Sequence, residues 1–251
     1  MRYFIHFAYN GASFHGWQRQ PNANSVQETL EHAFQQLLKK EIQLTAAGRT
    51  DAGVHARHMV AHFDWEGWLP ENLPFLLNQY LPSAIAIDKL QRVSGNAHAR
   101  FDALSRTYQY HLSFVKDPFR YPFHYYVKGN LAVDSMNAAA NILLEYEDFE
   151  CFSKVHTDVK TFLCKIEHAG WEYHENELIF TIKANRFLRN MVRSIVGTLI
   201  EIGKGKRPLE SLHQTLASKS RSQAGYSVPA HALFLTSIRY PETILFTNDK
   251  K

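Results

Sequence analysis

The sequence predicts an α+β protein built from two ferredoxin-like halves, each with the strand and helix order β-α-β-β-α-β. Two observations predict this fold. Strand-like alternation and helix-like spacing follow one another in that order before residue 104, and the same order returns after it. The expected halves are residues 1–103 and 104–245, followed by a tail at 246–251. We expect them to form a mixed, largely antiparallel sheet with a central cleft. RNA-recognition modules share this strand order.

The first half starts with an alternating strand at 2–9. Ser25 and Glu28 have the spacing of a capping box, in which Ser25 caps the first turn and Glu28 reaches back. Apolar residues at helical spacing then predict a helix over 26–38. The remaining elements are strands at 42–46, 58–63 and 85–90 and a helix at 71–80.

The second half starts with a strand of β-branched and aromatic residues at 106–113. Asp134 is placed to cap a helix that runs to about Leu144. The segments 165–173 and 178–184 predict a hairpin around the polar turn 174–177. A helix over 187–202 and a last strand at 233–240 complete the repeated order.

The composition is that of a soluble globular protein, with 45% hydrophobic and 21% charged residues among 251. No apolar run approaches the roughly 20 residues of a membrane helix, and the N-terminus lacks the pattern of a signal peptide. We therefore expect a cytoplasmic protein without a membrane partner. Cys151 and Cys164 form no C-x-x-C pair, so they predict free thiols rather than a zinc site or a disulfide framework.

The net charge of +4 is uneven along the chain. Residues 1–103 hold 9 basic and 9 acidic residues, whereas the rest hold 19 and 15. A basic second half is compatible with a polyanionic partner such as a nucleic acid.

The loop AAGRTDAGVHA at 46–56 is the first candidate site. Gly48 and Gly53 have the spacing of a phosphate loop, but Val54 and His55 stand where that motif needs Lys and Ser or Thr, which excludes it. Two interpretations remain open. The loop is a turn in which Asp51 caps backbone groups, or Arg49 beside Asp51 favours an ionised carboxylate that acts as a nucleophile.

The segment FLRNMVRSIVGTLIEIG at 187–203 carries Arg193 on a narrow polar strip of an otherwise apolar helix. The strip is either a solvated face or the place where Arg193 pairs with an anion.

Aromatic residues suggest two further contact regions. Tyr108 and Tyr110 share a strand face with Arg106, which is typical of cross-strand packing but also of base stacking. The loop 14–22 carries Trp17 with Arg19, and Trp17 either contacts RNA or anchors the loop in the core.

Metal and hydrolase chemistry receive little support. Among 14 histidines, His55, His58 and His62 cluster, but no cysteine or paired carboxylate completes a ligand set, so we expect weakly basic surface histidines rather than a metal-dependent hydrolase. No G-x-S-x-G elbow occurs.

Several motifs, in order, resemble the tRNA pseudouridine synthase A family over nearly the whole chain. They are FHGWQRQPN with SVQETLE, GRTDAGVHA, ARFDALSRTYQY, EDFECFSK, FLRNMVRSIVGTLIEIGKGK and PAHALFL. Asn10, Ala84 and Ala232 depart from the usual pattern of the family.

The resemblance implies an enzyme that isomerises uridine to pseudouridine at positions 38, 39 and 40 of the tRNA anticodon stem-loop. It implies a homodimer that needs no cofactor and no metal. By the same resemblance, Asp51 is the catalytic nucleophile, Arg49 helps to hold the flipped-out nucleotide, Tyr108 stacks on the target uracil, and Arg193 pairs with the aspartate. The alternative is a non-catalytic RNA-binding protein on the same fold.

Overall fold

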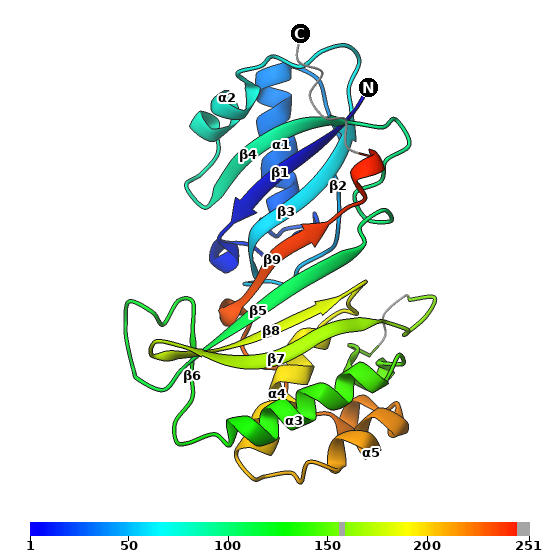
Figure 1. Cartoon of the computed structure of the whole chain (residues 1–251). Coiled ribbons are helices and arrows are strands. Elements are labelled where there is room, and N and C mark those ends of the chain that lie inside the picture. Colours follow the sequence, from blue (N-terminus) through cyan, green and yellow to red (C-terminus); the bar gives the residue numbers. More distant parts are fainter. Residues whose placement is uncertain (156–158, 245–251) are drawn as a thin grey trace. The chain divides into compact units, whose positions relative to one another are not determined.

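The computed structural model of the chain describes residues 1–155 and 159–244, so the tail expected at 246–251 lies outside the described residues. The chain divides into two compact units. Among the described residues, one unit contains Met1–Leu104 and residues 235–244, and the other contains residues 105–155 and 159–234. Each unit combines helices with mostly antiparallel strands, which confirms the predicted α+β class (Figure 1).

The first unit follows the predicted order. Its elements are β1 (Arg2–Tyr9), α1 (Val26–Leu38), β2 (Thr45–Ala46), β3 (His55–Asp64), α2 (Leu73–Tyr80) and β4 (Ile85–Val93). Strand β1 pairs antiparallel with both β3 and β4, and β2 pairs with β3. The resulting order β4-β1-β3-β2 is that of a ferredoxin-like sheet. Helices α1 and α2 contact each other (Figure 1).

Helix α1 begins as its capping residue predicts. Ser25 has an extended backbone, and its hydroxyl accepts a hydrogen bond from the Glu28 backbone N–H at 3.3 Å. The other half of the expected capping box is wrong, because the Glu28 carboxylate pairs with the Arg19 guanidinium at 3.3 Å instead. Val26, Leu30 and Phe34 are buried on one face, so the helix is fixed mainly by its apolar stripe.

The C-terminal segment packs into the first unit. The ring of Tyr240 lies 5.1 Å from the ring of Phe4, and its hydroxyl donates to the Ala99 carbonyl at 2.6 Å. The backbone N–H of Leu104 donates to the Arg239 carbonyl at 2.8 Å. Strand β9 (Leu233–Arg239), which leads into this segment, lies next to β3.

The second unit has strands and helices of its own. Its elements are β5 (Ser105–Ser113), β6 (Tyr125–Tyr126), α3 (Val133–Ile142), β7 (Ile166–His174), β8 (Glu177–Ala184), α4 (Met191–Gly203) and α5 (Ser211–Ser218). Strand β8 pairs antiparallel with β5 on one side and β7 on the other, while the short β6 runs parallel to β5. Helix α3 packs against β7 and α4.

Two helix starts in this unit differ from the prediction. Helix α4 begins at Met191 rather than at residue 187, because Asn190 adopts a left-handed conformation with φ of 67°. Helix α3 begins at Val133, so Asp134 lies in its first turn and is not the N-cap. A carboxylate there still interacts favourably with the helix dipole. Within residues 1–155 and 159–244, no helix is long and apolar enough to cross a membrane.

Candidate functional site

The Arg49–Asp51 segment lies in the loop between β2 and β3. A turn closes the loop, because the Val54 backbone N–H donates to the Asp51 carbonyl at 3.2 Å. Thr50 is buried, and its hydroxyl shares a 2.8 Å hydrogen bond with the Tyr9 hydroxyl at the end of β1. Arg49 is exposed and Asp51 is partly buried. The loop therefore presents its two charged side chains on either side of a residue anchored in the core.

A second loop, residues 11–17, supports the first through its backbone. The Trp17 N–H donates to the Thr50 carbonyl at 3.2 Å, and the Gly53 N–H donates to the Phe14 carbonyl at 3.3 Å. Gly16 has a φ of +94°, and a Cβ atom there would lie 2.5 Å from the Thr50 carbonyl oxygen. Such close contact between two backbones requires glycine.

The first turn of this supporting loop is tied to β3 in the same way. A Cβ atom on Gly11 would lie 2.1 Å from the Val54 carbonyl oxygen. The Gly11 backbone N–H donates to Nδ1 of His55 at 3.0 Å, and the Asn10 side chain accepts from the Ala12 N–H at 3.0 Å. The Asn10 side chain therefore caps this turn, as an aspartate would.

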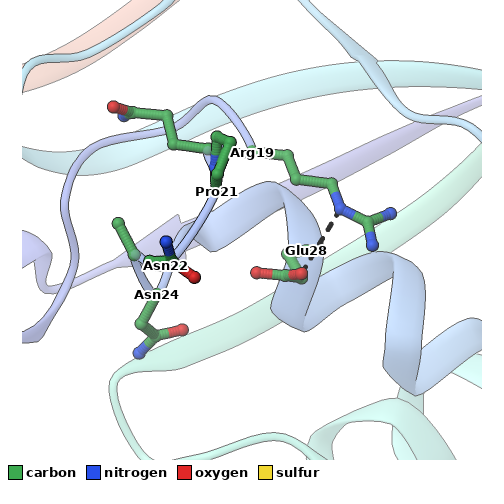
Figure 2. Close-up of a pocket in the computed structure, with 7 residues that line it drawn as sticks. Arg19, Pro21, Asn22, Asn24 and Glu28 are labelled. Atoms are coloured by element: carbon green, nitrogen blue, oxygen red, sulfur yellow. Dashed lines mark ion pairs between the residues drawn. The ribbon is translucent and has the colours of Figure 1, made fainter.

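The aromatic residues of the supporting loop lie in the core. Trp17 is 3% exposed, and its ring lies 5.6 Å from the ring of Phe7. The structure therefore confirms the interpretation that Trp17 anchors the loop in the core. Residues 19–24 line a surface pocket together with Glu28, and Arg19 and Glu28 form an ion pair there (Figure 2).

The expectation of surface histidines is wrong for two of the three clustered residues. His55 is 1% exposed and His62 is 7% exposed. Nδ1 of His62 accepts a hydrogen bond from the Ala99 N–H at 3.1 Å. Burial, together with the nearby His98, lowers the pKa of His62 to about 4. His58, partly buried, lies with its Nε2 3.1 Å from Nδ1 of His6. These histidines are structural groups of the first unit.

Tyr108 lies on β5 in the second unit, opposite Ile182 of β8. Its ring contacts that of Phe187 edge to face, with centroids 5.2 Å apart. Tyr110, two residues on, is fully buried, and its hydroxyl donates to the Pro229 carbonyl at 2.9 Å. Tyr110 is therefore a core residue, whereas Tyr108 is partly buried, with an aromatic neighbour that fixes its ring.

Arg193 lies in the first turns of α4 and is held by the segment 225–228. Its Nε donates to the Val228 carbonyl at 2.7 Å, and its own carbonyl accepts from the Val228 N–H at 3.2 Å. The face of α4 that carries Gly197 is buried. The interpretation of this strip as a solvated face is therefore wrong.

Sequence reasoning missed the residues that press segment 225–228 onto α4. A Cβ atom on Gly197 would lie 1.8 Å from the Tyr226 carbonyl oxygen. The Gly225 N–H donates to the Thr198 hydroxyl at 2.8 Å. Asn190 reaches the same segment, because its side-chain amide donates to the Ser227 hydroxyl at 2.6 Å. A glycine in the middle of an apolar helix is the feature that could have indicated such a contact.

Of the four predicted site residues, Arg49 and Asp51 share one loop of the first unit. Tyr108 and Arg193 lie in the second unit, on β5 and α4.

Comparison with known proteins supplies the context for this arrangement. A family model described as tRNA pseudouridine synthase matches residues 5–102 and 139–241. The tRNA pseudouridine synthase A of Parabacteroides distasonis is 49% identical over 99% of this chain and 99% of its own. The proteins of the same name from Bacteroides fragilis and Halalkalibacterium halodurans are 49% and 41% identical, over 97% and 90% of this chain and 98% and 88% of theirs.

Proposed function

The chain belongs to the tRNA pseudouridine synthase family, and we propose that it isomerises uridine to pseudouridine at positions 38, 39 and 40 of the tRNA anticodon stem-loop. The observation that carries the proposal is the Arg49–Asp51 loop, whose central Thr50 is anchored to Tyr9 and to the supporting loop. A reactive carboxylate needs such a rigid mount, since small displacements of a reacting group cost large factors in rate.

The reaction exchanges one glycosidic bond for another. The bond between N1 of uracil and C1′ of ribose breaks, the base turns, and C5 bonds to C1′. The proton on C5 is released and N1 gains one, so the product is an isomer of the substrate and no oxidant or reductant is consumed. The target nucleotide has to leave the base stack before its base and sugar are accessible together.

Asp51 is the nucleophile in this proposal. Its carboxylate either attacks the nucleotide covalently or drives elimination to a glycal. Arg49, exposed beside it, is suited to hold the backbone of the opened RNA. Tyr108 offers a ring face for the target uracil, with Phe187 fixing the ring edge to face. Arg193, oriented by the Val228 carbonyl, is the counter-ion of the aspartate.

The partner is tRNA, and we propose that the enzyme acts as a cytoplasmic homodimer, as the family resemblance implies. Phosphate contacts from the basic second half would make the affinity fall with added salt. A filter-binding titration at increasing KCl concentration measures this dependence. An affinity that does not change with salt would contradict the electrostatic part of the proposal.

Replacing the nucleophile gives the decisive test. Asp51→Asn should abolish release of tritium from tRNA labelled at C5 of uridine, because the amide cannot act as the carboxylate does, while tRNA affinity is retained. Asp134→Asn, on the exposed first turn of α3, is the matched control and should keep full activity. Substantial tritium release by the Asp51 variant would remove Asp51 from the mechanism. If the unaltered protein bound tRNA but left it unmodified, the result would instead favour the non-catalytic RNA-binding alternative.

A further inference from the structure

Two histidines and one glutamate converge in the second unit, on residues to which the proposed function assigns no role. We propose that His111, His124 and Glu177 form a binding site for a divalent transition-metal ion, with Zn²⁺ as the probe. One ligand atom from each residue, Nδ1 of His111, Nε2 of His124 and a carboxylate oxygen of Glu177, lies within 4.8 Å of the others.

The sheet register brings these residues together from three separate segments. Glu177 at the start of β8 pairs with Ser113, and Ile179 pairs with His111, so His111 and Glu177 are diagonal neighbours on one face. The short β6 runs parallel to β5, with Tyr125 beside Leu112. His124, which precedes Tyr125, therefore comes next to His111.

The contacts of Glu177 show that one carboxylate oxygen faces both imidazoles. Oε2 lies 3.1 Å from Nδ1 of His111, and it also contacts Nε2 of His124. The three side chains are 5%, 20% and 15% exposed for His111, Glu177 and His124. Burial alone would raise the pKa of Glu177, but its contacts with the two imidazoles hold it below its usual value. The glutamate is therefore an anion that two nitrogen ligands approach in a mostly buried place.

The position of the proton on the His124 ring favours the binding of a metal ion. Its Nδ1 lies 3.0 Å from the Arg120 carbonyl oxygen, which accepts hydrogen bonds, so Nδ1 carries a proton. In the neutral ring, Nε2 then bears a lone pair that faces the negative oxygen of Glu177. This arrangement is favourable only when a positive species, a proton or a metal ion, lies between the two atoms. Metal-ligating histidines commonly donate their second ring nitrogen to a backbone carbonyl in this way.

The donor set selects the class of ion. Two imidazoles and one carboxylate suit Zn²⁺ and related transition metals, which take nitrogen ligands, better than Mg²⁺ or Ca²⁺. Around Zn²⁺ with bonds of about 2.0–2.2 Å, tetrahedral ligand atoms lie roughly 3.3–3.5 Å apart. The 3.1 Å between Nδ1 of His111 and Oε2 of Glu177 is close to this. Nε2 of His124 is in direct contact with the same oxygen, so these two side chains would have to separate to admit the ion.

The ion would fix the loop 114–124 to the sheet. This loop exposes Phe119 and Tyr121, which are 89% and 65% exposed. The contact of His124 with Glu177 connects the loop to the start of β8, whereas the hydrogen bond of His124 with the Arg120 carbonyl lies within the loop. The expected effect of the metal is therefore on stability, and isomerisation should not require it.

The experiment titrates Zn²⁺ into the full chain after chelator treatment and dialysis, and measures heat of binding, metal content and melting temperature. We expect one Zn²⁺ per chain and a rise in melting temperature. His124→Gln should bind at least tenfold more weakly and lose the rise, because it removes one ligand at the loop edge and spares the buried His111. His168→Gln, on the exposed side of β7, is the matched control and should behave as the unaltered chain.

Three results would overturn the inference: no Zn²⁺ at micromolar concentration, equal binding by the two variants, or a melting temperature that Zn²⁺ leaves unchanged. Each would leave a proton between His124 and Glu177 as the species that holds the cluster. Tritium release by the metal-free chain is measured in parallel. An absence of tritium release would bear on the proposed function and not on the metal site.

Discussion

Gly197 offers a direct test of how α4 positions Arg193. In Gly197→Ala, the new Cβ atom would lie 1.8 Å from the Tyr226 carbonyl oxygen, whereas real Cβ contacts are essentially never under 3.0 Å. The carbonyl must therefore retreat by about 1.2 Å or α4 must shift. The Gly225 N–H is bonded to Thr198 on the same helix, so the segment cannot move away as a whole without breaking that bond.

The expected cost follows from this geometry. Overpacking of a tight core contact costs about 1–3 kcal/mol, and loss of the Gly225 hydrogen bond would add roughly 1 kcal/mol. The same displacement moves Val228, whose carbonyl accepts from Nε of Arg193 at 2.7 Å. We therefore expect a loss of about 2–4 kcal/mol in the free energy of unfolding and a fall in kcat of at least tenfold.

Urea unfolding measures the first quantity, and tritium release at saturating tRNA measures the second. Gly170→Ala on β7 is the matched control, because its Cβ atom would meet its nearest neighbours at an ordinary 3.7 Å. Its stability should stay the same or rise, since a strand glycine is replaced. If Gly197→Ala were as stable and as active as Gly170→Ala, segment 225–228 would not position Arg193.

Two further predictions concern the first unit. Burial and the neighbouring His58 lower the pKa of His6 from 6.5 to about 4. As pH falls from 6.5 to 4, the unfolded chain therefore takes up a proton before the folded chain does, and about 3 kcal/mol of the free energy of unfolding should be lost over this interval. Urea unfolding at pH 7 and pH 4.5 checks this, and an equal loss in His6→Gln would contradict it. Tyr9→Phe removes the hydrogen bond to Thr50 and should cost about 1–2 kcal/mol and lower kcat with little change in KM; unchanged kcat would show that Thr50 does not need this anchor.

Element order could be predicted from the sequence because periodicity reports it directly. The strand expected at 2–9 and the Ser25 cap of α1 both correspond to the structure, although both faces of β1 are largely buried. The start of α4 could not be predicted, since Phe187 and Leu188 continue the apolar stripe although Asn190 turns the chain into the left-handed region. Such a break depends on the tertiary contact of Asn190 with Ser227, which no local pattern records.

The candidate site shows the same limit. The loop pattern leaves the role of Arg49 and Asp51 open, and the family resemblance of GRTDAGVHA indicates both residues. Their support comes from Tyr9, which in the sequence looks like an ordinary strand residue. His55 illustrates the opposite error, since a polar side chain beside the loop predicted a surface group although it accepts the Gly11 N–H inside the core.

The glycines around the two loops have different physical tasks, and this changes how the motif is interpreted. A Cβ atom on Gly48 would meet no other atom within 4 Å, so this glycine leaves open space beside Arg49 where a nucleotide can approach. Gly16 leaves none, because the Thr50 carbonyl occupies the place of its missing side chain. Gly197 acts on segment 225–228 of the second unit as Gly16 acts on the Thr50 loop. In both units, a glycine lets one backbone segment lie directly on another. The contact at Gly16 holds the loop that carries Asp51, and the contact at Gly197 holds the helix that carries Arg193. Substituting these contact glycines should therefore affect turnover more than tRNA affinity, whereas substituting Gly48 should affect affinity first.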